Sequence, residues 1–217
     1  FPTRRSSDLT RIGNLRGCSG ITFDSPKSVY WVTAAGGNWS ANNWAASSGG
    51  AASTDNFPLA QDTAIIENTG LNASATVTLD AAIVNVSGIN MSTRTSAMTL
   101  SLGTNIFIYG DLTCGSGTTY SSSTILTFSG RNTQAITSAG KTIGAVAIDS
   151  YGGTVQLADA LNIGSNFVSV TNGTCDTKNY NVTALGLASS NSNVRTITLG
   201  SSTLTLSGSS PVDFATS

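Results

Sequence analysis

A short strand-like pattern returns six times in this 217-residue chain, and this repetition restricts the fold more than any other feature. The six runs are TVTL at Thr76, MTLSLG at Met98, ILTFSG at Ile125, TVQLAD at Thr154, YNVTAL at Tyr180 and TLTLSG at Thr203. Their first residues lie 22 to 29 residues apart, which is a spacing typical of solenoid repeats. A single unit of this kind cannot cover its apolar face, so the units are expected to stack.

Each run alternates apolar with small polar residues, as a half-buried strand does. The apolar residues expected to face one side are Val77, Leu79, Leu100, Leu102, Leu126, Phe128, Val155, Leu157, Leu204 and Leu206. Second alternating runs follow at 83–86, 106–109, 145–148 and 167–170. We predict an all-β fold, a parallel β-helix (β-solenoid) of about five to six rungs with two or three strands per rung. The alternative is an antiparallel β-sandwich or jelly roll, which spaces its strands similarly.

The low content of charged residues agrees with such a stack. Only 10% of the residues are charged, against roughly 25% in an ordinary soluble domain. Stacking places like residues above one another, so charged rows would repel, whereas rows of Ser, Thr and Asn can form hydrogen bonds. The net charge of −1 supplies no basic surface for phosphates. We therefore expect no nucleic-acid partner, and we expect no membrane insertion.

The chain contains no His, and this excludes several classes of enzyme and metal site. Ser-His-Asp and Cys-His nucleophile systems, the HExxH zinc site and other His-ligated metals all require that side chain. The three cysteines, Cys18, Cys114 and Cys175, show neither CxxC nor zinc-site spacing. We expect free thiols or core residues there, and no cofactor or metal.

Composition divides the chain into four segments. Residues 1–9 (FPTRRSSDL) match the translated end of a sequencing-library adapter, and we interpret them as an artefact. Residues 10–28 are interpreted as the end of a preceding module. Residues 29–70 contain all 3 Trp and are expected to cap the stack. Residues 71–217 hold the solenoid repeats, which we expect to be truncated at the C-terminus.

Four aromatic residues of the Trp-rich segment are candidate ligand-binding residues: Tyr30, Trp31, Trp39 and Trp44. Aromatic faces stack on pyranose rings, so these side chains could form a platform for a sugar. They could instead pack over the open end of the solenoid, where core and backbone need a cover. We favour the packing role.

Asp149 and Asp176 are the candidate catalytic pair for a polysaccharide lyase or hydrolase built on the same scaffold. The predicted register places them in adjacent rungs, within the roughly 5 to 9.5 Å that separates the two carboxylates of a glycosidase. Both also occur in sequences typical of turns, in which Asp caps its own backbone. We favour the turn interpretation, and therefore predict that the chain has no catalytic residues and is not an enzyme.

Thr-x-Thr pairs, such as Thr76 with Thr78 and Thr203 with Thr205, are similar to the hydroxyl arrays of ice-binding solenoids. The intervening runs carry Ser, Gln or Asn in place of one Thr, which breaks the array. β-branched residues are common at solvent-facing positions of strands, so these pairs do not require an ice-binding function. Ice binding is kept as a minor alternative.

The motif Gly37-Asn38-Trp39-Ser40 and the run from Gly173 to Val182 resemble β-helical repeat proteins of phage virions (tail-fibre-like) and bacterial surface adhesins. The resemblance extends over roughly residues 30–214 and carries no catalytic residues. It implies a non-enzymatic structural or adhesive segment of a larger protein, a rigid rod with a host-glycan contact, in a virion or at the cell surface. The implied partners are neighbouring repeats of the same longer chain, a cell-surface glycan and a homotrimer.

Overall fold

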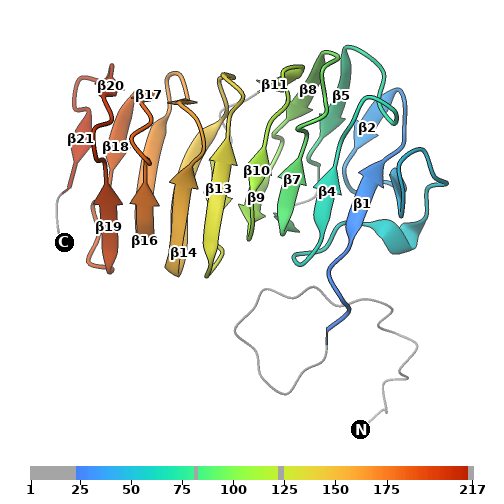
Figure 1. Ribbon diagram of the computed structural model, residues 1–217, viewed down its shortest axis with the longest axis horizontal. Coiled ribbons are helices and arrows are strands. Elements are labelled where there is room, and N and C mark those ends of the chain that lie inside the picture. The colour runs from blue at the N-terminus through green and yellow to red at the C-terminus, as the bar shows by residue number, and fades with distance from the viewer. Residues whose placement is uncertain (1–22, 81–82, 122–124, 215–217) are drawn as a thin grey trace, which may run out of the picture.

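The computed structural model describes residues 23–80, 83–121 and 125–214, and it is built almost wholly from β-strands. Helix in these ranges is limited to one 3-10 turn, η2 (Thr54–Asn56). Figure 1 shows the strands side by side in a single row between the two ends of the molecule. The prediction of an all-β parallel solenoid is confirmed, and the antiparallel sandwich is not formed. The adapter-like residues 1–9, Cys18 and most of 10–28 lie outside the described ranges.

Three strands on three faces make up one coil of the solenoid. The first face consists of β1 (Ser28–Trp31), β4 (Thr63–Ile65), β7 (Gly88–Asn90), β10 (Leu112–Thr113), β13 (Thr133–Thr137), the second half of β14 (Ala145–Leu157), the second half of β16 (Phe167–Asp176) and β19 (Arg195–Thr198). Each strand on this face pairs in parallel with the next. β14 and β16 turn a corner, so each contributes to two faces.

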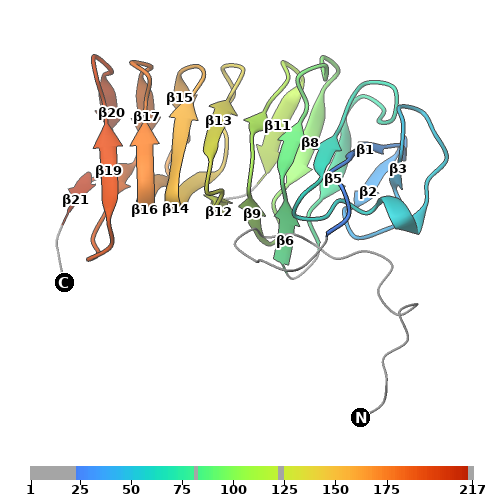
Figure 2. The same ribbon diagram turned by 60° about the horizontal axis from the view of Figure 1, so that its bottom comes forward.

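The other two faces repeat the same parallel order. The second face consists of β2 (Gly36–Asn38), β5 (Ala75–Thr78), β8 (Met98–Ser101), β11 (Thr118–Ser121), β15 (Leu161–Asn162), β17 (Val182–Ala184) and β20 (Leu204–Leu206). Among these described strands no pairing joins β11 to β15, so this face is divided into two parallel sheets. The third face consists of β6 (Ile83–Val86), β9 (Asn105–Ile108), β12 (Ile125–Phe128), the first halves of β14 and β16, β18 (Gly186–Ala188) and β21 (Val212–Asp213). Figure 2 shows the stack after a turn of 60°.

The stack contains about seven turns, more than the five to six that the repeats predict. The additional coil comes from the Trp-rich segment, whose β1, β2 and β4 pair directly with the strands of the repeats. This coil is difficult to recognise in the sequence because a long loop interrupts it. Val29 and Ala64, which are in register, are 35 residues apart (64 − 29), whereas Thr154 and Thr174 are 20 apart (174 − 154).

Alternating side chains point into the coil and form continuous apolar rows. On the first face one such row contains Ile89, Leu112, Ile136 and Leu157, none more than 5% exposed. Eight of the ten apolar residues predicted to face one side are buried, and the other two, Leu204 and Leu206 in the last coil, are partly buried. The alternation in the sequence therefore identifies the core correctly.

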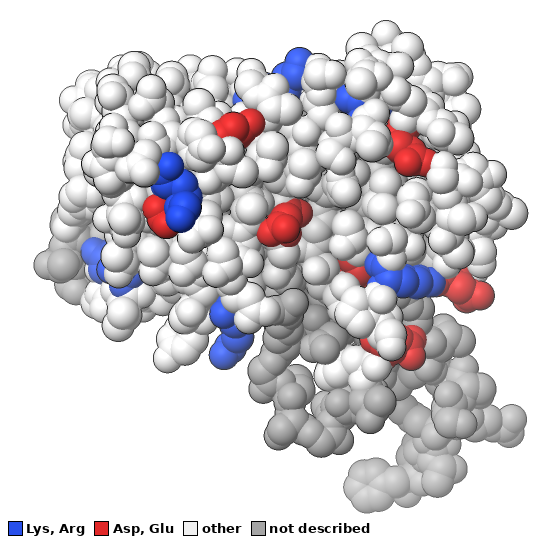
Figure 3. Space-filling view, in the orientation of Figure 1, with Lys and Arg blue, Asp and Glu red and all other residues white. Residues whose placement is uncertain are grey.

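The outer surface of the coils is mostly uncharged. Figure 3 shows single basic and acidic side chains and a few adjoining pairs of opposite sign, separated by wide neutral areas, with no large patch of either sign on the face in view. The outward rows explain this surface, because residues in register are often hydroxyl-bearing. Thr133, Thr154, Thr174 and Thr196, for example, follow one another up the first face.

Candidate functional site

Trp31, Trp39 and Trp44 form one aromatic cluster at the N-terminal end of the stack. The ring of Trp44 meets both others edge-on, with centroids 5.2 Å from Trp31 and 4.6 Å from Trp39. Trp31 donates its Nε1–H to the Thr33 carbonyl at 2.8 Å, and Trp44 donates its Nε1–H to the Trp39 carbonyl at 3.0 Å. None of the three indoles is more than 1% exposed. Their ring faces are therefore part of the core and are not open to a sugar.

The loop between β2 and β4 holds this cluster in place over the end of the stack. Its strand β3 (Trp44–Ala45) pairs antiparallel with β1, and both ribbon views show β3 and η2 at this end of the molecule (Figures 1 and 2). The Ser40 amide and hydroxyl donate to the Asp80 carboxylate at 2.9 and 2.6 Å. Burial of Asp80 opposes ionisation, but the hydrogen bonds outweigh it, and the pKa of Asp80 lies below its ordinary value.

The side chain of Tyr30 points in a different direction from the three indoles. It is half-buried and alternates with the buried Val29 and Trp31 along β1. Its neighbours in register are Ala45 on one side and Ile65 on the other. The four candidate aromatic residues thus do not share one exposed surface, and the geometry agrees with the packing role rather than with a sugar platform.

Asp149 and Asp176 are not brought together. Asp149 is in register with Asn172, whereas Asp176 is in register with Gln156. Asn172 and Asp176 are four residues apart on β16 (176 − 172), about 13 Å of extended strand, which exceeds the separation a glycosidase needs. The expected juxtaposition fails because β14 bulges at its corner and shifts the register. Asp176 instead accepts a hydrogen bond from the Lys178 amide at 2.9 Å, as a turn carboxylate does.

The corner that carries Asp149 borders an open groove of about 590 Å³. Three successive coils supply its walls, which include Tyr151 and Gly153 from β14, Asn172 and Thr174 from β16, and Asn193 and Thr196 from the last coil. We call this feature the corner groove. It contains an aromatic ring, amides and hydroxyls within one concave surface, and it is therefore the candidate functional site.

Glycines allow the chain to form the corner groove. β14 bulges between 149 and 154, where its register with β16 shifts, and Gly152 within the bulge has φ +71°. Gly173 in the next coil has φ +80°, and a Cβ atom there would lie 2.0 Å from the Ser150 carbonyl oxygen. Only glycine permits this conformation and this close approach together.

Two arginines hold the walls of the corner groove. The guanidinium of Arg131 lies 5.6 Å from the ring centroid of Tyr151, a cation–π contact that orients a side chain which is 69% exposed. On the opposite wall, Arg195 donates to the Ser189 hydroxyl and carbonyl and, at 2.9 Å, to the Asn193 carbonyl. These bonds fix the loop that precedes β19.

Sequence reasoning identified 149–153 as a turn but did not identify the corner groove. The groove forms only when the corners of three coils are stacked, and their positions are set by the bulge in β14. The available signal is an aromatic residue inside a Gly-rich turn, Tyr151, followed one coil later by Asn172 and two coils later by Asn193. Aligning the turns coil by coil would have found it.

The two described cysteines are buried and free. Burial raises the pKa of the Cys114 thiol to about 11 and that of the Cys175 thiol to about 12. Cys175 lies in a row with Val155 and Ile197, where a small apolar side chain is expected. No group of three or more Cys, Asp or Glu side chains that could hold a metal ion occurs among the described residues.

The hydroxyl pairs of the sequence are distributed over two faces. Thr76, Thr99 and Thr119 follow one another in register on the second face, as do Thr78, Ser101 and Ser121 beside them. Thr196 and Thr198 lie on the first face instead. The run at Met98 therefore continues the array over three coils of the second face, whereas Thr154 and Gln156 lie on the first face and Asn162 interrupts the row further along.

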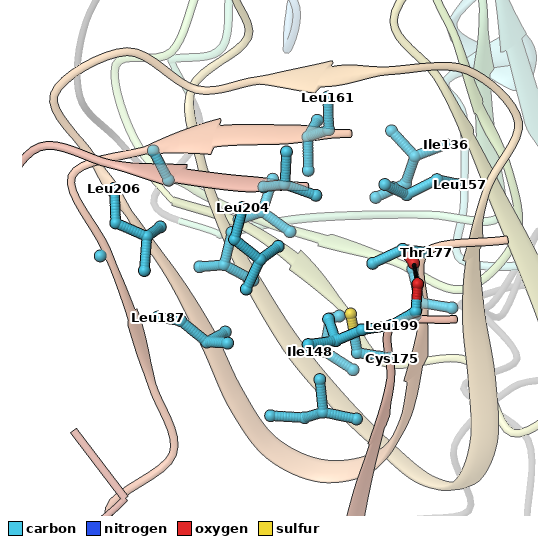
Figure 4. Close-up of a pocket in the computed structure, with 17 residues that line it drawn as sticks. Ile136, Ile148, Leu157, Leu161, Cys175, Thr177, Leu187, Leu199, Leu204 and Leu206 are labelled. Carbon is cyan, nitrogen blue, oxygen red and sulfur yellow. Dashed lines mark hydrogen bonds between the residues drawn. The ribbon is translucent and has the colours of Figure 1, made fainter. Parts of the chain in front are cut away.

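At the C-terminal end the core is less well covered than elsewhere. An apolar hollow inside the last coils is lined by residues such as Leu187, Leu199, Leu204 and Leu206 (Figure 4). Thr177 closes one side by donating its hydroxyl to the Leu199 carbonyl at 2.8 Å. Leu204 and Leu206 are only partly buried because no further described coil stacks on them.

Comparison with family models, with curated proteins and with solved structures finds no match to this chain. The described residues include no helix that is long and apolar enough to cross a membrane.

Proposed function

We propose that this chain is a non-enzymatic shaft segment of a larger virion or cell-surface protein, acting as a rigid spacer with an adhesive role. The observation that carries the proposal is the continuous apolar core through about seven stacked coils. Parallel ladders hold each coil to the next on the first face, and most coils on the other two faces as well, so extension of the rod must break backbone hydrogen bonds along its length. The resemblance of Gly37–Ser40 and Gly173–Val182 to repeats of virion and surface proteins supports the same role.

Neighbouring coils of the same longer chain are the partner that this role requires. The inward side chains Ile197, Leu204 and Leu206 of the last coil are partly exposed, whereas the equivalent rows upstream are buried. A further coil stacked about 4.8 Å away would cover them. A shaft of this kind grows by repetition, and each added coil buries the apolar face of the one before.

The separation of Asp149 from Asp176 supports a role without catalysis. A lyase or hydrolase on this scaffold would need acidic side chains close enough to act on one glycosidic bond. Incubation of the protein with neutral and acidic polysaccharides should release neither reducing ends nor unsaturated sugars. Release of either product, lost in the Asp149→Asn variant, would contradict the proposal.

Single-molecule force measurement on the full chain, tethered at its two ends, tests the spacer role. Outside the first coil, which a long loop interrupts, register partners lie from 19 residues (Val168 to Leu187) to 25 residues (Thr63 to Gly88) apart. Peeling of one such coil should therefore release about 65 to 85 Å of chain. We expect an abrupt rise in tension followed by lengthening in steps that are multiples of this size.

The urea-unfolded chain serves as the control for this measurement, because it extends smoothly from the lowest force. If the native protein extends in the same smooth way, its stacked coils do not resist tension, and the spacer role is rejected.

A further inference from the structure

We propose that the corner groove is a binding site for a neutral oligosaccharide. The inference rests on the adhesive part of the proposed function and gives that part a location, a ligand class and a set of residues. The site is distinct from the Trp-rich segment, whose indoles are buried.

The aromatic component of the site is Tyr151. A tyrosine ring offers a rigid apolar face with a polar tip, which suits the C–H face of a pyranose ring and the hydroxyls at its edge. At 69% exposure, Tyr151 is far more open to solvent than Tyr180, which is 42% exposed. The Arg131 guanidinium orients the ring from one side, so its position is set before a ligand arrives.

The polar component consists of side chains that have no other partner. The hydroxyls of Thr174 and Thr196 and the side-chain amide of Asn193 line the corner groove and make no hydrogen bond within the described part of the chain. Hydroxyls both donate and accept, and an amide does the same through two atoms. Such groups match the hydroxyls of a sugar, each of which also donates and accepts.

Of the three charged side chains at the corner groove, Arg195 and Asp149 are already hydrogen-bonded and Arg131 stacks on the Tyr151 ring, and this favours a neutral ligand. The guanidinium of Arg195 donates hydrogen bonds to Ser189 and to the Asn193 carbonyl. Asp149 accepts from the Asn172 amide at 2.5 Å. The groove volume of about 590 Å³ lies inside the range of roughly 300 to 1,000 Å³ that is usual for small-ligand sites.

A panel of immobilised oligosaccharides, both neutral and uronate-containing, tests the proposal with the full chain. We expect binding to one or more neutral members. Tyr151→Ala should weaken that binding by about tenfold or more, because it removes the stacking surface. Tyr151→Phe keeps the ring and should retain most of the affinity. The matched control is Tyr180→Ala, because Tyr180 is also exposed but does not line the groove. This variant should bind like the parent.

Thermal unfolding of each variant, followed by circular dichroism, confirms that the comparison is made between folded proteins. A folded parent that binds no neutral sugar overturns the proposal, and so does a Tyr151→Ala variant that binds as well as the parent. Binding restricted to uronates and lost in Arg131→Gln also overturns it. These results leave the stepwise extension under force unchanged, so failure of the binding site and failure of the shaft role are distinguishable.

Discussion

Gln134 shows how a single polar residue can be required inside an apolar stack. It faces inward from β13, is fully buried, and shares a row with Val155, Cys175 and Ile197 of later coils. Its Nε2 donates to the carbonyls of residues 108 and 110 at 2.9 and 2.8 Å, and its Oε1 accepts from the amide of residue 130 and the hydroxyl of residue 150. One side chain thus satisfies the backbone at a corner where the ladder is interrupted.

Replacement of Gln134 by Leu should therefore destabilise the protein strongly. The substitution leaves buried backbone groups without partners, at a cost of about 2 to 3 kcal/mol in the free energy of unfolding. Urea denaturation measures this cost. Gln156→Leu, at a half-buried outward position nearby, is the control and should change stability by no more than about 0.5 kcal/mol. Equal losses in both variants would show that Gln134 has no special role.

The buried thiols lead to a prediction about reactivity. In the unfolded chain a thiol has a pKa near 9, whereas the fold raises the pKa of Cys114 to about 11 and that of Cys175 to about 12. Their contribution to stability is present below pH 9 and is lost as the pH rises through 11 to 12. Iodoacetamide at pH 8 should leave both residues unmodified until urea is added. Peptide mass spectrometry detects the modification, and rapid native labelling would contradict the burial.

At the scale of elements, the alternation of apolar residues is sufficient to predict strands and their inward faces. It does not predict where the chain turns between faces, because two-residue strands such as β10 and β15 have no visible period. It also fails in the Trp-rich segment, where a loop interrupts the coil. Tyr151 was recognisable as a turn residue, but its place in a groove depends on the bulge in β14 and on two other coils.

Corner glycines give a test at this scale. Gly173 and Gly140 both have positive φ, +80° and +71°, so an alanine at either position costs about 1 to 2 kcal/mol in backbone conformation. A Cβ at Gly140 meets nothing within 4 Å, whereas one at Gly173 meets the Ser150 carbonyl oxygen at 2.0 Å. Gly173→Ala should therefore lower the urea midpoint much further than Gly140→Ala. Similar midpoints would mean that the coils are not in this close contact.

At the scale of the whole molecule, the solenoid has a well-covered N-terminal end and a less well-covered C-terminal end. β3 and the indole cluster cover the first coil, while Leu204 in the last coil is partly exposed. Stability in such a stack is approximately a sum over coils and their interfaces. The contribution of a core residue should therefore depend on which coil it occupies.

Leu100→Ala and Leu204→Ala compare these two environments. Leu100 is fully buried in a central coil, and its truncation should cost about 2 to 5 kcal/mol in the free energy of unfolding. Leu204→Ala should cost about 1 kcal/mol, because part of its surface is already in water. Urea denaturation of both variants provides the comparison. A larger loss at Leu204 would show that the last coil is covered by something else.

Pulsed electron paramagnetic resonance between nitroxide labels tests the linear stack of coils most directly. In a Cys18→Ser background, one label replaces Thr76, and the second replaces Asn162, Thr183 or Thr205, which are successive in register on the second face. At about 4.8 Å per coil, these positions lie four, five and six coils from Thr76. The account predicts separations of about 19, 24 and 29 Å, rising by one coil spacing at each step. Distances that do not increase in this order, as in a sandwich whose strands return beside one another, would contradict it.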